Sequence, residues 1–202
     1  MKELIFATHN AHKRDEISRM LDGSFIVKNL SDVGIHNDIP ENALTLEGNA
    51  QIKAEYVHSR TGLNVFADDT GLEVDALGGE PGVHSARYAG EERDPTANMH
   101  KLLHVLAGQS NRTARFKTVI WLIMDGQAHR FVGEARGRII EVQRGTGGFG
   151  YDPIFEPDLP EALAASFGHS PTFAELSPEQ KNAISHRGKA MAQLIDYLKT
   201  HA

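Results

Sequence analysis

The sequence contains no cysteine, and only one of its 202 residues is a tryptophan. The absence of cysteine excludes disulfide frameworks, thiol catalysis and cysteine-ligated zinc. Long hydrophobic runs are also missing: no stretch of about 18 apolar residues occurs, so we expect no membrane span. The opening residues Met1–Thr8 hold too short an apolar run for a signal peptide, which favours a cytoplasmic protein.

The chain has no large excess of charge of either sign. It carries 21 Lys and Arg against 27 Asp and Glu, a formal net charge of -6 at pH 7. This balance argues against bulk binding to nucleic acid or to an anionic membrane, so we expect neither partner. It still permits a local basic pocket for a phosphate ligand.

The composition is that of an ordinary globular protein, with 40% hydrophobic and 24% charged residues. A chain of this length buries roughly 70% of its unfolded surface and needs no covalent or metal staples. With no internal repeat and no evident linker, residues 1–202 are expected to form a single domain.

The hydrophobic pattern alternates between short apolar runs and amphipathic helices. Strands are predicted at 4–7, 25–27 and 65–67, with helices between them that begin at Asn10 and Thr45. Further on, the pattern predicts a loop over 78–93 and a helix from Asp94 to Gly108. Two long strands follow at 113–124 and 127–142, around an Asp125-Gly126 turn. A capping box at Ser177–Gln180 precedes the last helical residues. The predicted fold class is α/β, with a mixed β-sheet flanked by helices.

A first candidate site lies between the first predicted strand and helix. It consists of Thr8, His9, Asn10, Ala11, His12 and Lys13. A strand-to-helix turn leaves backbone N–H groups at the positive end of a helix dipole, which suits an anion. Lysine in the first turn opposes the dipole unless an anion is present. A capped helix with an exposed lysine explains the segment as well.

A second candidate is acidic. Glu41 and Glu47 flank the start of the second predicted helix, and Asp68 and Asp69 follow the strand predicted at 65–67. Strand ends of α/β sheets commonly bind ligands, and carboxylate oxygens suit Mg²⁺ that bridges a polyphosphate. Neighbouring strand residues point to opposite faces, so one of the two aspartates is expected to face a ligand. Taken alone, an Asx turn explains the pair slightly better.

Two polar residues of the second predicted helix form a third candidate. Asn49 and Lys53 are four residues apart, and we expect them opposite the apolar stripe of that helix. There an amide and an ammonium group would face a phosphate. A solvated helix face accounts for the two residues equally well.

A glycine-rich loop covers residues 145–153 and reads GTGGFGYDP. It contains G-x-G-x-x-G, but the residues that follow are not helical in character, so a dinucleotide fingerprint is rejected. Glycines around Phe149 favour a loop whose backbone approaches a flat ring stacked on that side chain; a glycine-rich turn with a core aromatic is the alternative. Downstream, Lys181 and the segment Ser185–Gly188 supply cations that suit phosphate or a carbonyl, although a helix surface with scattered bases reads the same.

In this order, the motifs resemble those of the inosine/xanthosine triphosphate pyrophosphatase family. The matching stretches are Ala7–Lys13, Asn49–Ala54, Ala67–Leu72, Gly78–Tyr88, Gly145–Phe155 and Lys181–Gly188. Each stretch is weak alone, but the ordered set is specific and spans nearly the whole chain.

The resemblance implies an elongated mixed sheet in two lobes, with the nucleotide in an active-site cleft between them, and a homodimer. It further implies Mg²⁺-dependent cleavage of the α–β phosphate bond of deaminated purine nucleoside triphosphates (ITP, dITP and XTP), which yields a nucleoside monophosphate and pyrophosphate. The expected role is removal of these compounds from the nucleotide pool.

The resemblance also implies roles for individual positions. Asp69 would be catalytic, and Glu41, Asp69 and Asp68 would engage the metal. The substrate would be held by Thr8, His9, Asn10, Ala11, His12, Lys13, Lys53, Thr70, Phe149, Gly150, Tyr151, Asp152, Lys181, His186 and Arg187. His186, Arg187 or loop backbone would read the 6-oxo group of the purine. The family usually carries Glu before the Asn-Ala pair, whereas this chain has Gly48. Glu47 is adjacent but rotated by about 100° around a helix, so it does not replace the missing carboxylate.

Three other functions remain open from the residues. A related pyrophosphatase for pyrimidine or modified nucleotides differs only in its base site. A nucleotide-binding module without catalysis is disfavoured because binding alone needs no carboxylate beside the phosphates. A nucleic-acid-binding protein is disfavoured by the net charge.

Overall fold

The structure is a computed structural model that describes residues 2–21 and 23–201, apart from the side chain of His12. The chain divides into two compact units. Unit 1 comprises Met1–Asp69, Thr118–Val132 and Ala190–Ala202, and unit 2 comprises Thr70–Lys117 and Gly133–Lys189. Each unit is therefore made of segments that are distant in sequence.

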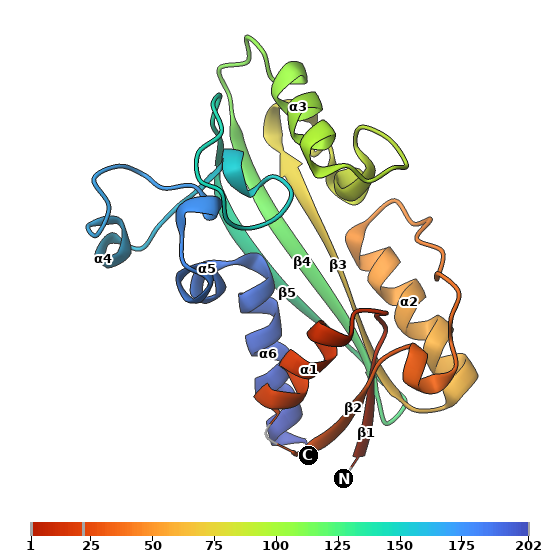
Figure 1. The fold of residues 1–202 in the computed structure, drawn as a ribbon. Coiled ribbons are helices and arrows are strands. Elements are labelled where there is room, and N and C mark those ends of the chain that lie inside the picture. Colours follow the sequence, from red (N-terminus) through yellow and green to blue (C-terminus); the bar gives the residue numbers. More distant parts are fainter. Residues whose placement is uncertain (1, 22, 202) are drawn as a thin grey trace. The chain divides into compact units, whose positions relative to one another are not determined.

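Six strands form one sheet in the order β2-β1-β3-β4-β5-β6 (Figure 1). They are β1 (Lys2–Phe6), β2 (Phe25–Lys28), β3 (Asn64–Val74), β4 (Thr113–Met124), β5 (Gln127–Ile139) and β6 (Phe155–Pro157). Strand β1 pairs in parallel with both β2 and β3, whereas β5 and β6 are antiparallel. The predicted mixed α/β sheet is confirmed.

The described helices include four that begin directly after a predicted capping residue. They are α1 (Ala11–Met20), α2 (Leu46–Thr61), α3 (Pro95–Val105), α4 (Glu161–Ala164), α5 (Pro178–Ile184) and α6 (His186–Thr200), with short 3-10 turns η1 (Ser31–Val33), η2 (Asp75–Leu77), η3 (Gly82–Arg87), η4 (Asp152–Ile154) and η5 (Phe173–Glu175). Asn10, Thr45, Asp94 and Ser177 each accept a first-turn backbone N–H, so all four predicted N-caps are confirmed.

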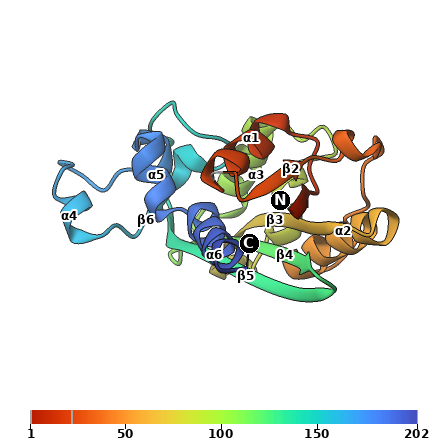
Figure 2. The ribbon, with the colours of Figure 1, turned by 90° about the horizontal axis from the view of Figure 1, so that it is seen from below.

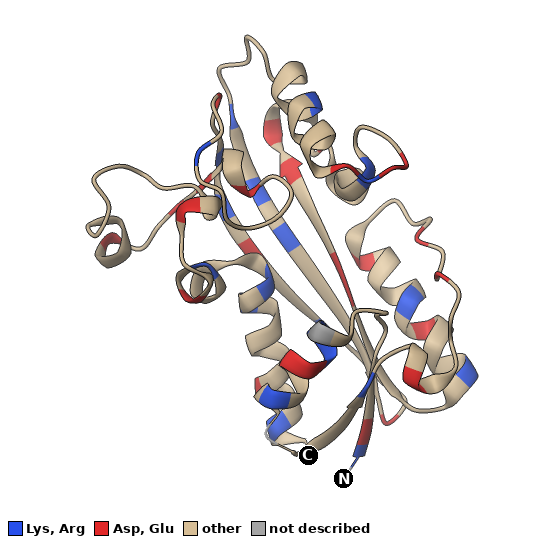
Figure 3. Cartoon of the chain, viewed as in Figure 1, with Lys and Arg blue, Asp and Glu red and all other residues tan. Residues whose placement is uncertain are grey.

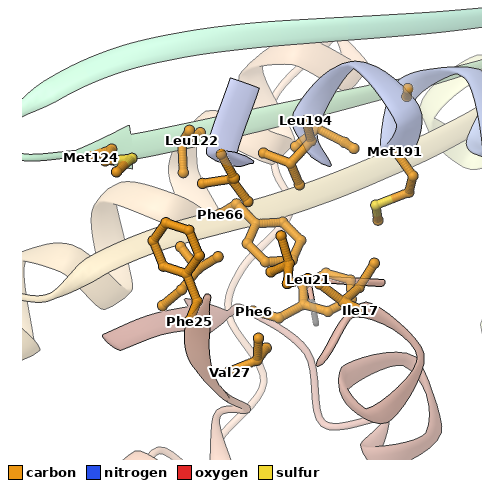
Figure 4. Packing of buried hydrophobic residues seen from close by; sticks show 14 residues of the cluster. Phe6, Ile17, Leu21, Phe25, Val27, Phe66, Leu122, Met124, Met191 and Leu194 are labelled. Carbon is orange, nitrogen blue, oxygen red and sulfur yellow. The ribbon is translucent and has the colours of Figure 1, made fainter. Parts of the chain in front are cut away.

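In unit 1, the alternation of side chains along the strands divides the core into two clusters. Phe6 and Phe66 stack at 4.3 Å between ring centroids and pack with Ile17 of α1 and Leu194 of α6 (Figure 4). The neighbouring strand residues, Val65 among them, pack instead against α2. Strand β3 therefore presents alternate residues to α1 and α6 on one face and to α2 on the other.

Unit 2 has its own core. Phe116 of β4, Phe155 of β6 and Phe173 of η5 form an aromatic group with centroid distances of 4.8 to 6.0 Å. Leu102 of α3 and Leu72 of β3 are fully buried in the same cluster. This core supports the glycine-rich loop that follows β5.

Several predicted boundaries are wrong. Strand β3 does not end at residue 67 but continues to Val74, and β5 ends at Ile139 rather than at 142. The expected loop at 78–93 contains η3, and Ser185 separates α5 from α6. The Asp125-Gly126 turn is confirmed, since both residues have positive φ, 50° and 79°.

The two ends of the described chain meet within unit 1. Lys2 Nζ donates to the carbonyl oxygen of His201 at 3.1 Å, and Figure 2 shows both termini beside β1 and α6. Acidic and basic residues are interspersed along the chain (Figure 3). Among residues 2–21 and 23–201, no helix combines the length and the apolar character needed to cross a membrane.

Candidate functional site

The turn between β1 and α1 has the form that suits an anion. Asn10 Oδ1 accepts from the Lys13 N–H at 3.2 Å, and Thr8 Oγ1 accepts from the Asn10 N–H at 3.2 Å. These bonds hold the first turn of α1, in which no acidic residue occurs. His9 and Ala11 are exposed there, whereas the side chain of His12 lies outside the described part of the structure. The N-terminus of α1 thus carries helix-dipole charge and Lys13 together.

The acidic pair lies within a strand, not at its end. Asp68 and Asp69 are in the middle of β3, just past Phe66, the last β3 residue that pairs with β1. The site is therefore at the carboxyl end of β1, and the expectation of a β3 strand end is wrong. The cause is that β3 extends beyond the end of β1 as a longer strand.

The two aspartates point to opposite faces, as strand geometry predicts. Asp68 Oδ2 is 3.9 Å from Lys13 Nζ, on the α1 side. Asp69 Oδ1 is 3.7 Å from Lys53 Nζ, and its Oδ2 accepts from Asn49 Nδ2 at 3.1 Å, on the α2 side. An Asx turn with solvated carboxylates does not describe this arrangement.

Lys53 is the centre of charge on the α2 side. Its side chain is only 12% exposed, and its ammonium group bonds to the Glu41 carboxylate and, at 2.7 Å, to the carbonyl oxygen of Asp68. Burial disfavours the charged form, but the negative charges of Asp69, Glu41 and Asp68 outweigh it and raise the pKa of Lys53. The lysine is therefore a permanent cation at this site.

The predicted position of Asn49 opposite the apolar stripe of α2 is wrong. Asn49 is 1% exposed and belongs to the buried face with Leu46 and Ala50. It follows Leu46 by three residues, which places it beside the stripe on a helix. A solvated helix face therefore does not account for Asn49 or for the buried Lys53.

In unit 2, the glycine-rich loop is organised around Asp152. This carboxylate is 3% exposed, accepts from the Phe149 N–H and forms an ion pair with Lys181. Gly148 lies so close that a Cβ there would be 2.1 Å from Asp152 Oδ2. The contacts of the buried Asp152 hold the loop in place, and Phe149 remains 79% exposed.

Tyr151 anchors the same loop. It is 4% exposed, and its hydroxyl donates to the carbonyl oxygen of Ser85 in η3 at 2.8 Å. Ser85 Oγ in turn accepts from the Leu72 N–H of β3 at 2.8 Å. Burial raises the pKa of Tyr151, with a contribution from Tyr88. This chain of bonds links two of the sequence motifs that lie far apart, and no sequence signal indicates it.

His186 is a buried and uncharged histidine. Its ring stacks on Phe116 at 4.7 Å with 13° between the planes, and its Nδ1 has no hydrogen-bond partner among the residues that the structure describes. Burial, helped by Lys181 and Arg187, lowers its pKa to about 3. A neutral ring has one donor and one acceptor nitrogen. Arg187 and Thr70, the other predicted binding residues of unit 2, are half-buried.

Comparisons with known proteins agree over almost the whole length. The sequence profile of the Ham1 family matches residues 4–197. The chain belongs to the Ham1 family. It is 52% identical to the dITP/XTP pyrophosphatase of Flavobacterium johnsoniae, over 97% of both chains, and 52% identical to that of Porphyromonas gingivalis, over 98% of both. The structure of the Staphylococcus aureus Ham1 protein matches with a TM-score of 0.90, at 38% identity and with full coverage of both chains.

At Gly48, the backbone of this Ham1 protein leaves no space for a larger side chain. A Cβ at Gly48 would be 2.6 Å from the Ala43 Cβ and 3.1 Å from Thr45 Oγ1. The segment before α2 therefore packs directly on the helix at the position of the missing glutamate. Glu47 is engaged elsewhere, in an ion pair with Arg130 at 2.6 Å.

The acidic residues of this Ham1 protein determine whether it can hold a divalent cation. Within the described residues, no three His, Asp or Glu side chains converge closely enough to hold a metal. Mg²⁺, however, is usually bound by one or two carboxylates together with substrate phosphates and water. Glu41 and Asp69 both contact the Lys53 ammonium, so two carboxylates of the kind that Mg²⁺ prefers lie on the same side of β3. The donor set fits Mg²⁺ of this kind.

Proposed function

We propose that this chain hydrolyses deaminated purine nucleoside triphosphates, namely dITP, XTP and ITP, to the monophosphate and pyrophosphate. The observation that carries the proposal is the buried Lys53, bordered by Glu41 and Asp69, in a Ham1-family chain. In a chain of this family, such a group offers an ammonium for the phosphates and carboxylates that can hold Mg²⁺ or take a proton from water. The names of the relatives, dITP/XTP pyrophosphatases, support the substrate class.

Unit 1 would bind the triphosphate. The first turn of α1, from Thr8 to Lys13, offers backbone N–H groups and one ammonium, and Lys53 offers a second. Together they supply local positive charge in a protein whose net charge is -6.

Asp69 would act on the attacking water. Its carboxylate is held by Asn49 on one oxygen and faces Lys53 with the other. In the proposed step, the water oxygen attacks the α-phosphorus, Asp69 takes its proton, and the α–β bond breaks with pyrophosphate leaving. The base residue thus belongs to the group that also orients the phosphates.

Mg²⁺ is part of the proposal. Glu41 and Asp69 would hold it with the substrate phosphates; Asp68, the third predicted ligand, points to the α1 side of β3. When bound, the ion neutralises phosphate charge and makes the α-phosphorus more electrophilic.

Unit 2 would bind the base. The exposed Phe149 offers a face for stacking, and Gly150, Tyr151 and Asp152 continue the loop that carries it. Lys181, His186 and Arg187 supply donors for the 6-oxo group. Adenine has an amino group at this position, so it would leave such a donor unpaired, and a mismatch of this kind discriminates strongly.

The proposal includes a homodimer that acts in the cytoplasm on the nucleotide pool. Its support is the resemblance to the family. Sedimentation equilibrium checks the dimer, which requires twice the chain mass of 22.2 kDa.

The first experiment is an assay of pyrophosphate release from ITP with Mg²⁺, with ATP and GTP as parallel substrates. We expect strong release from ITP and XTP and weak release from ATP and GTP. Phosphate release instead of pyrophosphate would contradict the proposed bond.

A second panel separates the main alternative. If pyrimidine or modified triphosphates are cleaved and ITP is not, the chain is a pyrophosphatase of another base class. Binding of ITP without release of any product would make it a nucleotide-binding module.

A further inference from the structure

The side-chain amide of Asn49 connects the segment that carries Glu41 to the Asp69 carboxylate. Asn49 is 1% exposed, and both polar atoms of its amide bond to residues outside α2. Its Oδ1 accepts from the Ala43 N–H at 2.9 Å, and its Nδ2 donates to Asp69 Oδ2 at 3.1 Å. The proposed function uses this side chain only as the partner of one Asp69 oxygen.

Only an uncharged amide satisfies both of these contacts. An aspartate at position 49 would still accept from the Ala43 N–H, but it would not donate to Asp69 and would place a like charge against it. An alanine would leave both the Ala43 N–H and the Asp69 oxygen without this partner. The chemistry of both neighbours therefore specifies Asn.

The bond to Ala43 also fixes the segment that carries Glu41. Ala43 is two residues beyond Glu41 and packs on Gly48, where a Cβ would be 2.6 Å from its own. Thr45 then caps α2 by accepting from the Gly48 N–H at 3.0 Å. The close approach at Gly48 and the amide bond at Asn49 together seat this segment on the helix.

We infer that Asn49 is a positioning residue, whose amide sets the Asp69 carboxylate and the Glu41-bearing segment in their places relative to Lys53. The inference rests on the proposed function in assigning Asp69 and Glu41 to the reaction. Misplacement of a reacting group by about 1 Å is enough to cost about 10²-fold in rate.

The test compares Asn49→Asp and Asn49→Ala by two measurements. The first is the hydrogen exchange of the Ala43 amide, followed by NMR in the protein without metal or substrate. We expect exchange to accelerate about tenfold or more in Asn49→Ala, which removes the acceptor, and to change little in Asn49→Asp, which keeps it. The second is the split between kcat and KM, with whichever triphosphate the wild-type protein hydrolyses. We expect both variants to lower kcat by about 10²-fold and to leave KM within about threefold.

Asn98 provides a matched control. It is 3% exposed in α3 of unit 2, accepts from the Ala89 N–H at 2.6 Å and donates to the Ala86 carbonyl oxygen at 3.0 Å. Asn98→Asp makes the same change in a buried amide whose two partners are backbone groups of Ala86 and Ala89 rather than Asp69 and the Glu41-bearing segment. We expect its kcat to stay within about threefold of wild type even if its melting temperature falls.

The outcomes separate the two proposals. Failure of the wild-type protein to hydrolyse any triphosphate contradicts the proposed function. Unchanged Ala43 exchange in Asn49→Ala overturns the positioning inference whatever the substrate, as does a kcat loss in Asn49→Asp no larger than in Asn98→Asp. If Asn49→Asp does not fold, Asn49→Ala decides the question through both measurements.

Discussion

Asp69 is the residue on which the proposed chemistry most depends. The Asp69→Asn variant keeps an oxygen that can accept from Asn49 Nδ2 but loses the ability to take a proton. Because a general base typically contributes about 10²–10⁴-fold, we expect kcat for ITP to fall by at least about 10²-fold. Steady-state kinetics, with thermal unfolding measured in parallel, checks this prediction.

Glu47→Gln is the control for Asp69→Asn. Glu47 is also an acidic residue of unit 1, but it pairs with Arg130 at 2.6 Å rather than with Lys53. Its removal should leave kcat nearly unchanged. Equal rates for Asp69→Asn and the wild type would remove Asp69 from the reaction.

His186 makes the stability of the protein depend on pH. Burial lowers its pKa in the folded protein from 6.5 to about 3, so between these pH values the unfolded chain binds a proton at His186 and the folded chain does not. Stability is therefore fully present above about pH 6.5 and falls as the pH is lowered toward 3, by at most about 1.4 kcal/mol per pH unit. We predict that His186→Phe, which keeps a ring against Phe116, removes this part of the pH dependence.

Urea unfolding at pH 8 and pH 5 measures the effect. The wild type should lose more free energy of unfolding between these two values than His186→Phe does. Parallel losses in the two proteins would mean that His186 takes up its proton in the folded state.

Among the elements, β3 shows where prediction from the sequence succeeded and where it failed. The buried run at 65–67 was apparent from the residues, and Asp68 and Asp69 were identified there only as a candidate pair. The length of the strand was not apparent, since Asp, Thr and Gly at positions 69–71 are typical of a turn. They continue as strand although the pairing with β1 ends at Phe66, because β3 also has β4 as a neighbour in the sheet, a tertiary context that the local sequence does not contain.

Helix boundaries were predictable for a physical reason. A cap is a local interaction, so Thr45 and Ser177 identify a helix start from a few neighbouring residues. The burial of Asn49 and the bond between Tyr151 and Ser85 depend on residues 6 to 66 positions away. Such contacts determine how the site is held, and they became apparent only in the structure.

The glycine-rich loop permits a prediction with an internal control. Gly148 and Gly150 both have positive φ, 78° and 65°, but only at Gly148 would a Cβ meet Asp152, whereas the space around Gly150 is open. Both Gly→Ala variants bear a backbone cost of about 1–2 kcal/mol. Gly148→Ala should in addition displace the Asp152 carboxylate and raise KM for ITP.

KM and the melting temperature of the two variants, measured side by side, check this prediction. Similar losses of melting temperature with a larger KM for Gly148→Ala are expected. Equal KM values would show that the contact between Gly148 and Asp152 does not position the loop for substrate.

At the scale of the whole molecule, the candidate residues are divided between the two units. Lys53 and the acidic residues that contact it belong to unit 1. Unit 2 contains Phe149, Asp152, Lys181 and His186. Composition indicated only one ordinary globular chain, because each unit is assembled from segments that the sequence separates. This division predicts that substitutions in unit 1 act mainly on the chemical step and those in unit 2 mainly on recognition of the base.

Two lysines test the division. Lys53→Met should lower kcat for ITP by about 10²-fold or more, because it removes a cation from the phosphate site. Lys181→Met should raise KM about tenfold and reduce the preference for ITP over ATP, with kcat within about threefold of wild type. Lys101→Met is the control. Lys181 lies over the ring of Phe173 at 5.4 Å, and Lys101 likewise lies over the ring of Tyr88 at 4.3 Å but belongs to neither candidate site.

The double variant completes this prediction. Lys53 contacts Glu41, Asp69 and the carbonyl oxygen of Asp68, whereas Lys181 forms its ion pair with Asp152. The logarithms of their effects on kcat/KM should therefore add. A double variant no worse than Lys53→Met alone would mean that both lysines serve one step, and the assignment of chemistry to one unit and base recognition to the other would be wrong.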